Sequence, residues 1–202
     1  SFDFYFLHKK SIAINMKTEE GMEIVHKLLA KADVFISNYR KRAVDKFGLD
    51  YETLHAKYPR LIHATLTGYG ENGPLKDYPG FDTTAYWGRA GLAKSMREKD
   101  GDPIVTPSSI GDIASGTVLC GGIMGALYHR ERTGEAMKVY ISLYGMGVYQ
   151  NQEQMFFSQV GYQYPQSRLY PRRAYANTYL LKDGYFHFHT LDPKRDMPRV
   201  LK

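Results

Sequence analysis

The sequence predicts an α/β fold in which a parallel β-sheet is flanked by helices. Strand and helix patterns alternate through the first half of the chain, as they do in strand–helix–strand units joined by right-handed crossovers. Of the 202 residues, 43% are hydrophobic and 24% are charged, a composition typical of a folded globular domain. These observations indicate a doubly wound parallel sheet.

The first strand is predicted at residues 11–15 (SIAIN), where apolar residues alternate. Thr18 is a favourable N-cap for the helix that follows, which has an acidic first turn and apolar residues at helical spacing as far as Ala32. The next elements are expected in the order strand, helix, helix, strand, at residues 34–37, 43–47, 51–58 and 61–67. Gly48 stops the first of these two helices, and Asp50 and Pro59 bound the second.

The longest helix pattern runs from about Ile113 to Arg132 and is apolar on nearly every side, so we expect it to be buried. Its four glycines, at positions 116, 121, 122 and 125, lower helix propensity and suggest close approach of another backbone. Cys120 is expected to be an inert core thiol, and Gly134 to end the helix.

Asp112 lies at the start of this long helix, directly after Gly111. One interpretation is a plain N-cap. The other is catalytic: a carboxylate at a helix N-terminus keeps a low pKa, neighbouring backbone N–H groups can stabilise an oxyanion, and the carboxylate can attack an acyl group. On that interpretation Gly111 leaves room for a bulky acyl substrate.

The last third of the chain predicts a strand at 138–143 and a hairpin of two strands, 179–182 and 185–191, around Asp183 and Gly184. His187 and His189 share one face of the second hairpin strand, as two metal ligands would. No third ligand is spaced nearby, so we expect no metal site.

The charge is uneven: residues 1–160 hold 19 Lys and Arg against 18 Asp and Glu, and residues 161–202 hold 8 against 3. A nucleic-acid module or a piece of a larger protein would both explain the basic end. The first residue, Ser1, and the uncapped segment 198–202 favour a fragment.

A single cysteine excludes an internal disulfide and suggests the cytoplasm. The longest uncharged stretch, 113–128, is shorter than the ~18 apolar residues of a membrane span, so we expect no membrane segment.

Ligands of parallel sheets bind beyond the carboxyl ends of the strands. The residues at those positions here are 15–17, 38–42 and 68–73, which supply amides, cations and backbone N–H groups suited to a phosphorylated ligand. The alternative is that these are ordinary solvated strand ends.

Four segments, found in order, resemble the class III CoA-transferases, the formyl-CoA and carnitine CoA-transferase group. They are KKSIAINMKTEEG (9–21), ADVFISNYRKRAVDKFGLDYETL (32–54), PRLIHATLTGYGENGPLKDYPGFD (59–82) and GDIASGTVLCGGIMGALYHRERTGE (111–135). The GYGENGP and PGFD segments look most similar to the clostridial branch that moves CoA between 2-hydroxy acids or aryl-acrylates.

This resemblance implies a CoA-transferase that uses an acyl-CoA and a carboxylic acid, with Asp112 forming an acyl anhydride and then an aspartyl-CoA thioester, and without a metal or redox cofactor. It also implies an interlocked homodimer. The implied CoA contacts are Asn15, Lys17, Asn38, Tyr39, Arg40 and Lys46, with Phe81 and Asp82 lining the channel near the nucleophile. Segments that the family has before and after this stretch are lacking. The resemblance therefore implies a Rossmann-like sheet that is incomplete in this chain, with residues 1–160 forming part of the large CoA-binding domain and residues 161–202 forming a linker and the start of the smaller domain. The family's usual Gly-Gln is replaced by Ala136 and Met137.

Two other functions compete with CoA transfer. An acyl-CoA racemase of the same fold needs a second acid or base, which that group places as a histidine where this chain has Phe81, and Phe81 cannot move protons. His63 and His129 lie elsewhere, in a strand and far along the helix. A non-catalytic phosphate- or RNA-binding module would use the basic end, which lacks a recognised aromatic-basic pattern, so we expect no nucleic-acid partner.

Overall fold

The computed structural model describes residues 5–107 and 109–200. Ser1, Leu201 and Lys202, which bear on the expectation of a fragment, lie outside the described residues. The chain divides into two compact units. The first contains the residues up to Thr67, residues 71–77 and residues 116–141, and the second contains residues 68–70, residues 78–115 and the residues from Ser142 onward.

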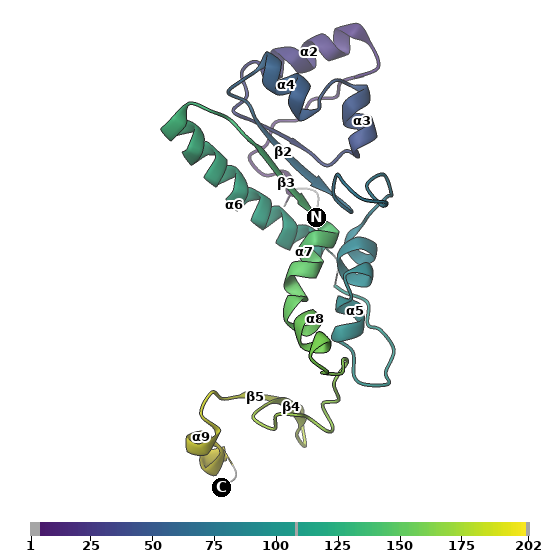
Figure 1. Ribbon diagram of the computed structural model, residues 1–202, viewed down its shortest axis with the longest axis vertical. Helices are drawn as coiled ribbons and strands as arrows, with labels where there is room; N and C mark the ends of the chain where they lie inside the picture. The colour runs from purple at the N-terminus through teal and green to yellow at the C-terminus, as the bar shows by residue number, and fades with distance from the viewer. Residues whose placement is uncertain (1–4, 108, 201–202) are drawn as a thin grey trace. The chain divides into compact units, whose positions relative to one another are not determined.

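A three-stranded sheet organises the first unit, with the order β1 (Val34–Ser37), β2 (Ile62–Thr67) and β3 (Lys138–Ser142). Strands β1 and β2 are parallel, with Val34 opposite Ile62. The arrows of β2 and β3 point the same way (Figure 1). The predicted parallel sheet flanked by helices is therefore confirmed.

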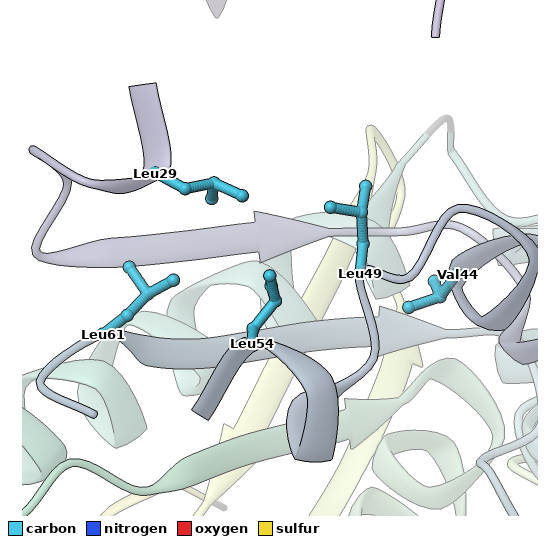
Figure 2. Close-up of a cluster of buried hydrophobic side chains, with 5 residues drawn as sticks. All are labelled: Leu29, Val44, Leu49, Leu54 and Leu61. Carbon is cyan, nitrogen blue, oxygen red and sulfur yellow. The ribbon is translucent and has the colours of Figure 1, made fainter. Parts of the chain in front are cut away.

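Three helices, α2 (Glu19–Leu29), α3 (Lys41–Lys46) and α4 (Tyr51–Lys57), pack on one side of this sheet. The side chains of Thr18 and Asp50 cap α2 and α4, as predicted, by accepting the N–H groups of Gly21 at 3.1 Å and Thr53 at 2.9 Å. The apolar cluster beneath them is shown in Figure 2 and consists of Leu29, Val44, Leu49, Leu54 and Leu61.

Helix α6 (Ile110–Thr133) covers the other side of the sheet. Ile62 and Ala64 of β2 are completely buried in the clusters that contain Leu119, Ile123 and Ala126 of α6. Because side chains alternate along a strand, the residues between them, His63 and Thr65, face the side that carries α3 and α4.

The second unit is built from short helices and one hairpin. Its elements are η1 (Asp82–Arg89, a π-helix), α5 (Leu92–Ser95), α7 (Leu143–Gln150), α8 (Gln152–Gln159), β4 (Ala176–Leu180), β5 (Tyr185–His189) and α9 (Pro193–Val200). Helix α7 approaches η1 so closely that a Cβ atom on Gly147 would lie 2.5 Å from the Tyr86 carbonyl oxygen. The side-chain amide of Asn151 donates to the Ala90 carbonyl at 3.0 Å and further joins these elements.

Two expected strand features differ from the structure. Residues 11–15 form no strand in the described part of the chain, and Ile12 is 63% exposed. An alternating pattern needs a neighbouring strand to pair with, and here the segment instead enters a turn in which the Thr18 N–H donates to the Asn15 carbonyl at 3.2 Å. The predicted hairpin is present, but its connection is four residues, 181–184, rather than two.

The expectation that the long helix is buried on every side was wrong. Val118, Met124 and Tyr128 are 48%, 55% and 69% exposed, and Cys120 is exposed rather than a core thiol. The helix packs one stripe on the sheet, so its other side has no cover among the described residues. Only Gly122 of the four glycines makes a close approach, toward Val139, while a Cβ on Gly116, Gly121 or Gly125 would meet nothing within 4 Å in the described part of the chain.

Helix α6 has the length and composition of a membrane span: it has 24 residues, and an 18-residue window within it has a mean hydropathy of 1.5. This is weak evidence for a membrane segment, because the core helices of soluble proteins satisfy the same criterion.

The C-terminal turn of α6 is held to the sheet by Arg130, whose side chain is 7% exposed. Its guanidinium donates to the Arg60 carbonyl at 2.8 Å, to the Asp33 carbonyl at 3.3 Å and to the Asp33 carboxylate at 2.8 Å. Asp33 precedes β1 and Arg60 precedes β2, so one side chain joins the helix to the starts of two strands.

Replacing Arg130 with Met removes these hydrogen bonds while keeping an apolar stem. We expect the free energy of unfolding to fall by about 2 kcal/mol, because hydrogen bonds to charged groups contribute on this scale. Urea unfolding followed by circular dichroism measures the change. The exposed Arg132 in the same turn provides the matched control, Arg132→Met, which should shift the value by less than about 0.5 kcal/mol. Equal losses in the two variants would contradict this role for Arg130.

Candidate active site

Asp112 is an exposed residue in the first turn of α6, two residues after the start of the helix at Ile110, so it is not the N-cap. Its pKa is raised above the ordinary value, first by partial burial of the carboxyl group and second by the negative charge of Asp82. The expected low pKa was therefore wrong, because the nearby carboxylate and desolvation outweigh the helix N-terminus. A raised pKa makes the ionised carboxylate more basic.

Asp82 begins η1 and is only 7% exposed. Its Oδ1 accepts the backbone N–H of Gly111 at 2.6 Å, which ties η1 to the first turn of α6. Its Oδ2 is buried and has no hydrogen-bond partner within the described ranges. The carboxylate thus satisfies one of the free N–H groups at the start of α6.

The backbone N–H groups around Asp112 are already engaged. Gly111 donates to Asp82, and the Ile113 N–H donates to the Ser109 carbonyl at 2.9 Å. These two groups are therefore not available to stabilise an oxyanion in the way the sequence suggested.

The expectation that Gly111 leaves room for a bulky acyl substrate was wrong. A Cβ atom at this position would lie 2.3 Å from Cγ of Tyr86 and 2.4 Å from Oδ1 of Asp82. The space next to the Gly111 Cα is thus filled by the protein's own side chains, and glycine is required for packing.

Tyr86 is 3% exposed and packs against Gly111. Its hydroxyl donates to Oε1 of Gln150 on α7. Burial and the charge of Asp82 raise the pKa of the phenol, which keeps it protonated as the donor. The hydrogen bond between Tyr86 and Gln150 was not predicted, because the two residues lie 64 positions apart and their contact leaves no local pattern in the sequence.

Phe81 precedes η1 and is 68% exposed, so its ring is open to a ligand. Its N–H donates to the Thr84 hydroxyl at 3.0 Å, which orders the start of η1. Phe81, Asp82 and Asp112 all lie in the second unit.

The other six candidate residues lie in the first unit and are exposed: Asn15, Lys17, Asn38, Tyr39, Arg40 and Lys46. The Asn15 carboxamide accepts the Lys17 N–H at 3.1 Å, so these two residues share one turn. Asn38, Tyr39 and Arg40 follow directly on the carboxyl end of β1, as predicted for a ligand-binding edge.

A cavity of about 230 Å³ opens beside these residues, between β2 and the α3–α4 segment, with Tyr39, His63, Glu71 and Lys138 in its wall. Glu71 pairs with Lys138 and accepts the Thr65 hydroxyl at 3.2 Å. His63 is 2% exposed, its Nε2 donates to the Leu49 carbonyl at 2.9 Å, and burial lowers its pKa. The pairing of Glu71 with Lys138 was not predicted, because the two residues lie 67 residues apart in the chain.

No group of three His, Cys, Asp or Glu side chains suited to a metal ion occurs among the residues that the structure describes. His187 instead shares a hydrogen bond of 2.9 Å with the Thr178 hydroxyl across the hairpin. The absence of a metal from the reaction stays a prediction.

Residues 4–201 match the model of CoA-transferase family III. The chain belongs to this family. The clostridial resemblance is also confirmed: (R)-2-hydroxy-4-methylpentanoate CoA-transferase of Clostridioides difficile is 42% identical over 177 residues, covering 88% of this chain and 44% of the relative. Cinnamoyl-CoA:phenyllactate CoA-transferase of Clostridium sporogenes is 41% identical over 191 residues, covering 92% of this chain and 46% of the relative. The chain thus spans a little under half the length of these curated relatives.

Solved structures of family III relatives have the same fold. The crystal structure of a hypothetical protein from Mycobacterium tuberculosis superposes with a TM-score of 0.79 at 30% identity, covering 96% of this chain and 52% of that one. A CAIB/BAIF family protein from Brucella suis gives 0.76 at 33% identity, with 90% and 48% covered.

The packing around Gly111 yields a direct test. Gly111→Ala should lower the free energy of unfolding by about 2 kcal/mol, because the added methyl group overlaps Tyr86 and Asp82. Thermal and urea unfolding would measure this change. Gly116→Ala, in the same helix but with open space around the added Cβ, is the control and should raise stability by up to roughly 1 kcal/mol. Gly111→Ala with unchanged stability would show that the corner is not tightly packed.

Proposed function

We propose that the protein containing this chain transfers CoA from an acyl-CoA donor to a carboxylic acid, with Asp112 as the nucleophile. The observation that carries the proposal is an accessible carboxylate with a raised pKa in the first turn of α6, in a chain of CoA-transferase family III. A more basic carboxylate is a stronger nucleophile toward a thioester carbonyl.

In the first half of the reaction, the Asp112 carboxylate attacks the thioester carbonyl. A C–O bond forms, the C–S bond breaks, and CoA leaves as a thiolate, which leaves a mixed anhydride on Asp112. The thiolate then attacks the aspartyl carbonyl of the anhydride, which releases the donor acid and forms an aspartyl-CoA thioester.

In the second half, the acceptor carboxylate attacks the aspartyl-CoA thioester, forms a second anhydride and releases the thiolate. Attack of the thiolate on the acceptor's carbonyl gives the new acyl-CoA and restores the Asp112 carboxylate. Every bond broken is matched by one formed, so no oxidant or reductant is needed.

CoA is proposed to bind through the six exposed residues of the first unit. Lys17, Arg40 and Lys46 supply cations for its phosphates, and Asn15 and Asn38 supply amide groups. Tyr39 lies between Asn38 and Arg40 with 47% of its surface exposed and offers a flat apolar contact. Phe81 is proposed to contact the acyl-CoA near Asp112.

The acid is proposed to be a carboxylic acid of the kind used by the two clostridial relatives, whose names specify 2-hydroxy-4-methylpentanoate and phenyllactate. We further propose a cytoplasmic homodimer that uses no metal or redox cofactor.

Trapping with hydroxylamine tests the nucleophile. The full-length protein incubated with cinnamoyl-CoA and hydroxylamine should acquire a hydroxamate on Asp112, because both the anhydride and the aspartyl-CoA thioester react with this amine. Peptide mass spectrometry locates the product. Asp112→Asn should abolish both the hydroxamate and transfer to an added 2-hydroxy acid.

Asp102→Asn, at an exposed carboxylate on the loop before α6, is the matched control and should label Asp112 normally. Absence of the hydroxamate across a panel of acyl-CoA donors would overturn the proposal. Exchange of the α-proton of the acyl group under those conditions would instead favour an acyl-CoA racemase.

A further inference from the structure

We propose that Asp82 is a positioning residue for the reaction of Asp112: it holds the first turn of α6 through the Gly111 N–H and keeps a fixed negative charge beside the nucleophile. This inference rests on the proposed function. It differs from the role that family resemblance implies for Asp82, which is to line the channel for CoA.

The hydrogen-bond geometry gives Asp82 a mechanical role. Oδ1 of Asp82 accepts the Gly111 N–H in a short hydrogen bond, with an O–N distance of 2.6 Å, and the Asp82 residue is only 7% exposed. Gly111 is the residue directly before Asp112, so this hydrogen bond helps to hold the backbone of Asp112 in place. A carboxylate used in this way is not free to bind CoA through the same oxygen.

Packing leaves the Asp82 carboxylate little freedom to move. The Tyr86 ring and Asp82 Oδ1 occupy the space where Gly111 would carry a Cβ, and Tyr86 is in turn held by Gln150 of α7. A side chain fixed from several directions provides the preorganisation that a reacting group needs.

The charge of Asp82 acts on Asp112 directly. Along with burial, it raises the pKa of Asp112, and it also raises that of Tyr86. The elements packed against η1 add no further acid to this corner: α7 carries Tyr144 and Tyr149 as its titratable groups, α5 carries Lys94, and η1 itself carries Arg89 besides Asp82 and Tyr86. Asp82 is therefore the only carboxylate that these described elements place beside Asp112.

Two neighbouring carboxylates repel each other when both are ionised. Acylation of Asp112 converts its charged carboxylate into a neutral anhydride or thioester, which removes that repulsion. The buried charge of Asp82 thus raises the energy of the free enzyme relative to both covalent intermediates, and it favours every step in which Asp112 becomes acylated.

Two substitutions separate the hydrogen bond from the charge. Asp82→Asn keeps an oxygen that can accept the Gly111 N–H and removes the charge. Asp82→Ala removes both. Asp102→Asn removes an exposed carboxylate of the same unit and serves as the matched control.

The readout is the pH dependence of the first-order rate at which the full-length protein forms the Asp112 adduct from cinnamoyl-CoA. The acidic limb of this profile reports ionisation of Asp112 in wild type. We expect Asp82→Asn to move the limb to lower pH, since loss of the neighbouring charge lowers the pKa of Asp112. Asp82→Ala should in addition lower the maximal rate about tenfold or more through loss of positioning. Asp102→Asn should leave both unchanged.

An unshifted limb in Asp82→Asn, with normal labelling of Asp112 in wild type, would overturn the inference and leave the proposed function intact. An increased KM for the acyl-CoA without a shift of the limb would show that Asp82 is a CoA contact.

If wild type gives no adduct, the proposed function fails. ¹³C NMR titration of the Asp112 carboxyl in wild type and in Asp82→Asn still tests the coupling between the two carboxyl groups without any reaction. Should Asp82→Asn not fold, the wild-type titration suffices: a single-step titration of the Asp112 carboxyl at the ordinary pKa of aspartate would overturn the inference.

Discussion

The hydrogen bond from the Gly111 N–H to the buried Asp82 carboxylate holds the first turn of α6, and Asp112 is the next residue. The surrounding features depend on this bond. Residue 111 has to be glycine because the acceptor oxygen and the Tyr86 ring occupy the space of a Cβ atom. The hydroxyl of the buried Tyr86 donates to Gln150. The pKa of Asp112 is raised by burial of its carboxyl group and, second, by the charge of Asp82.

Strand β2 shows how one short segment serves both packing and chemistry in the first unit. Ile62 and Ala64 face α6 and form the apolar core, whereas His63 and Thr65 face the polar cavity. Strand geometry alone produces this division, because successive side chains point to opposite sides. The polar side is tolerated because Glu71 meets both Lys138 and Thr65, and His63 stays neutral.

Local patterns predicted local structure well. The caps at Thr18 and Asp50, the strands β1, β2 and β3 and the place of Asp112 in the first turn of α6 could all be read from neighbouring residues. The sequence could not show that, among the described residues, residues 11–15 pair with no strand and one side of α6 is uncovered, because both depend on distant segments. The role of Gly111 and the raised pKa of Asp112 were missed for the same reason: Asp82 and Tyr86 lie more than twenty residues earlier in the chain.

Arg130 has a consequence for the order in which the first unit assembles. Its hydrogen bonds close chain loops of 97 residues to Asp33 and 70 residues to Arg60, whereas the caps of α2 and α4 span three residues. Long loops cost more chain entropy to close, so we expect these hydrogen bonds to form late, after the strands that they join have paired. Contacts made after the rate-limiting barrier slow unfolding more than they speed folding. We therefore expect Arg130 to slow the unfolding of the first unit more than it speeds its folding.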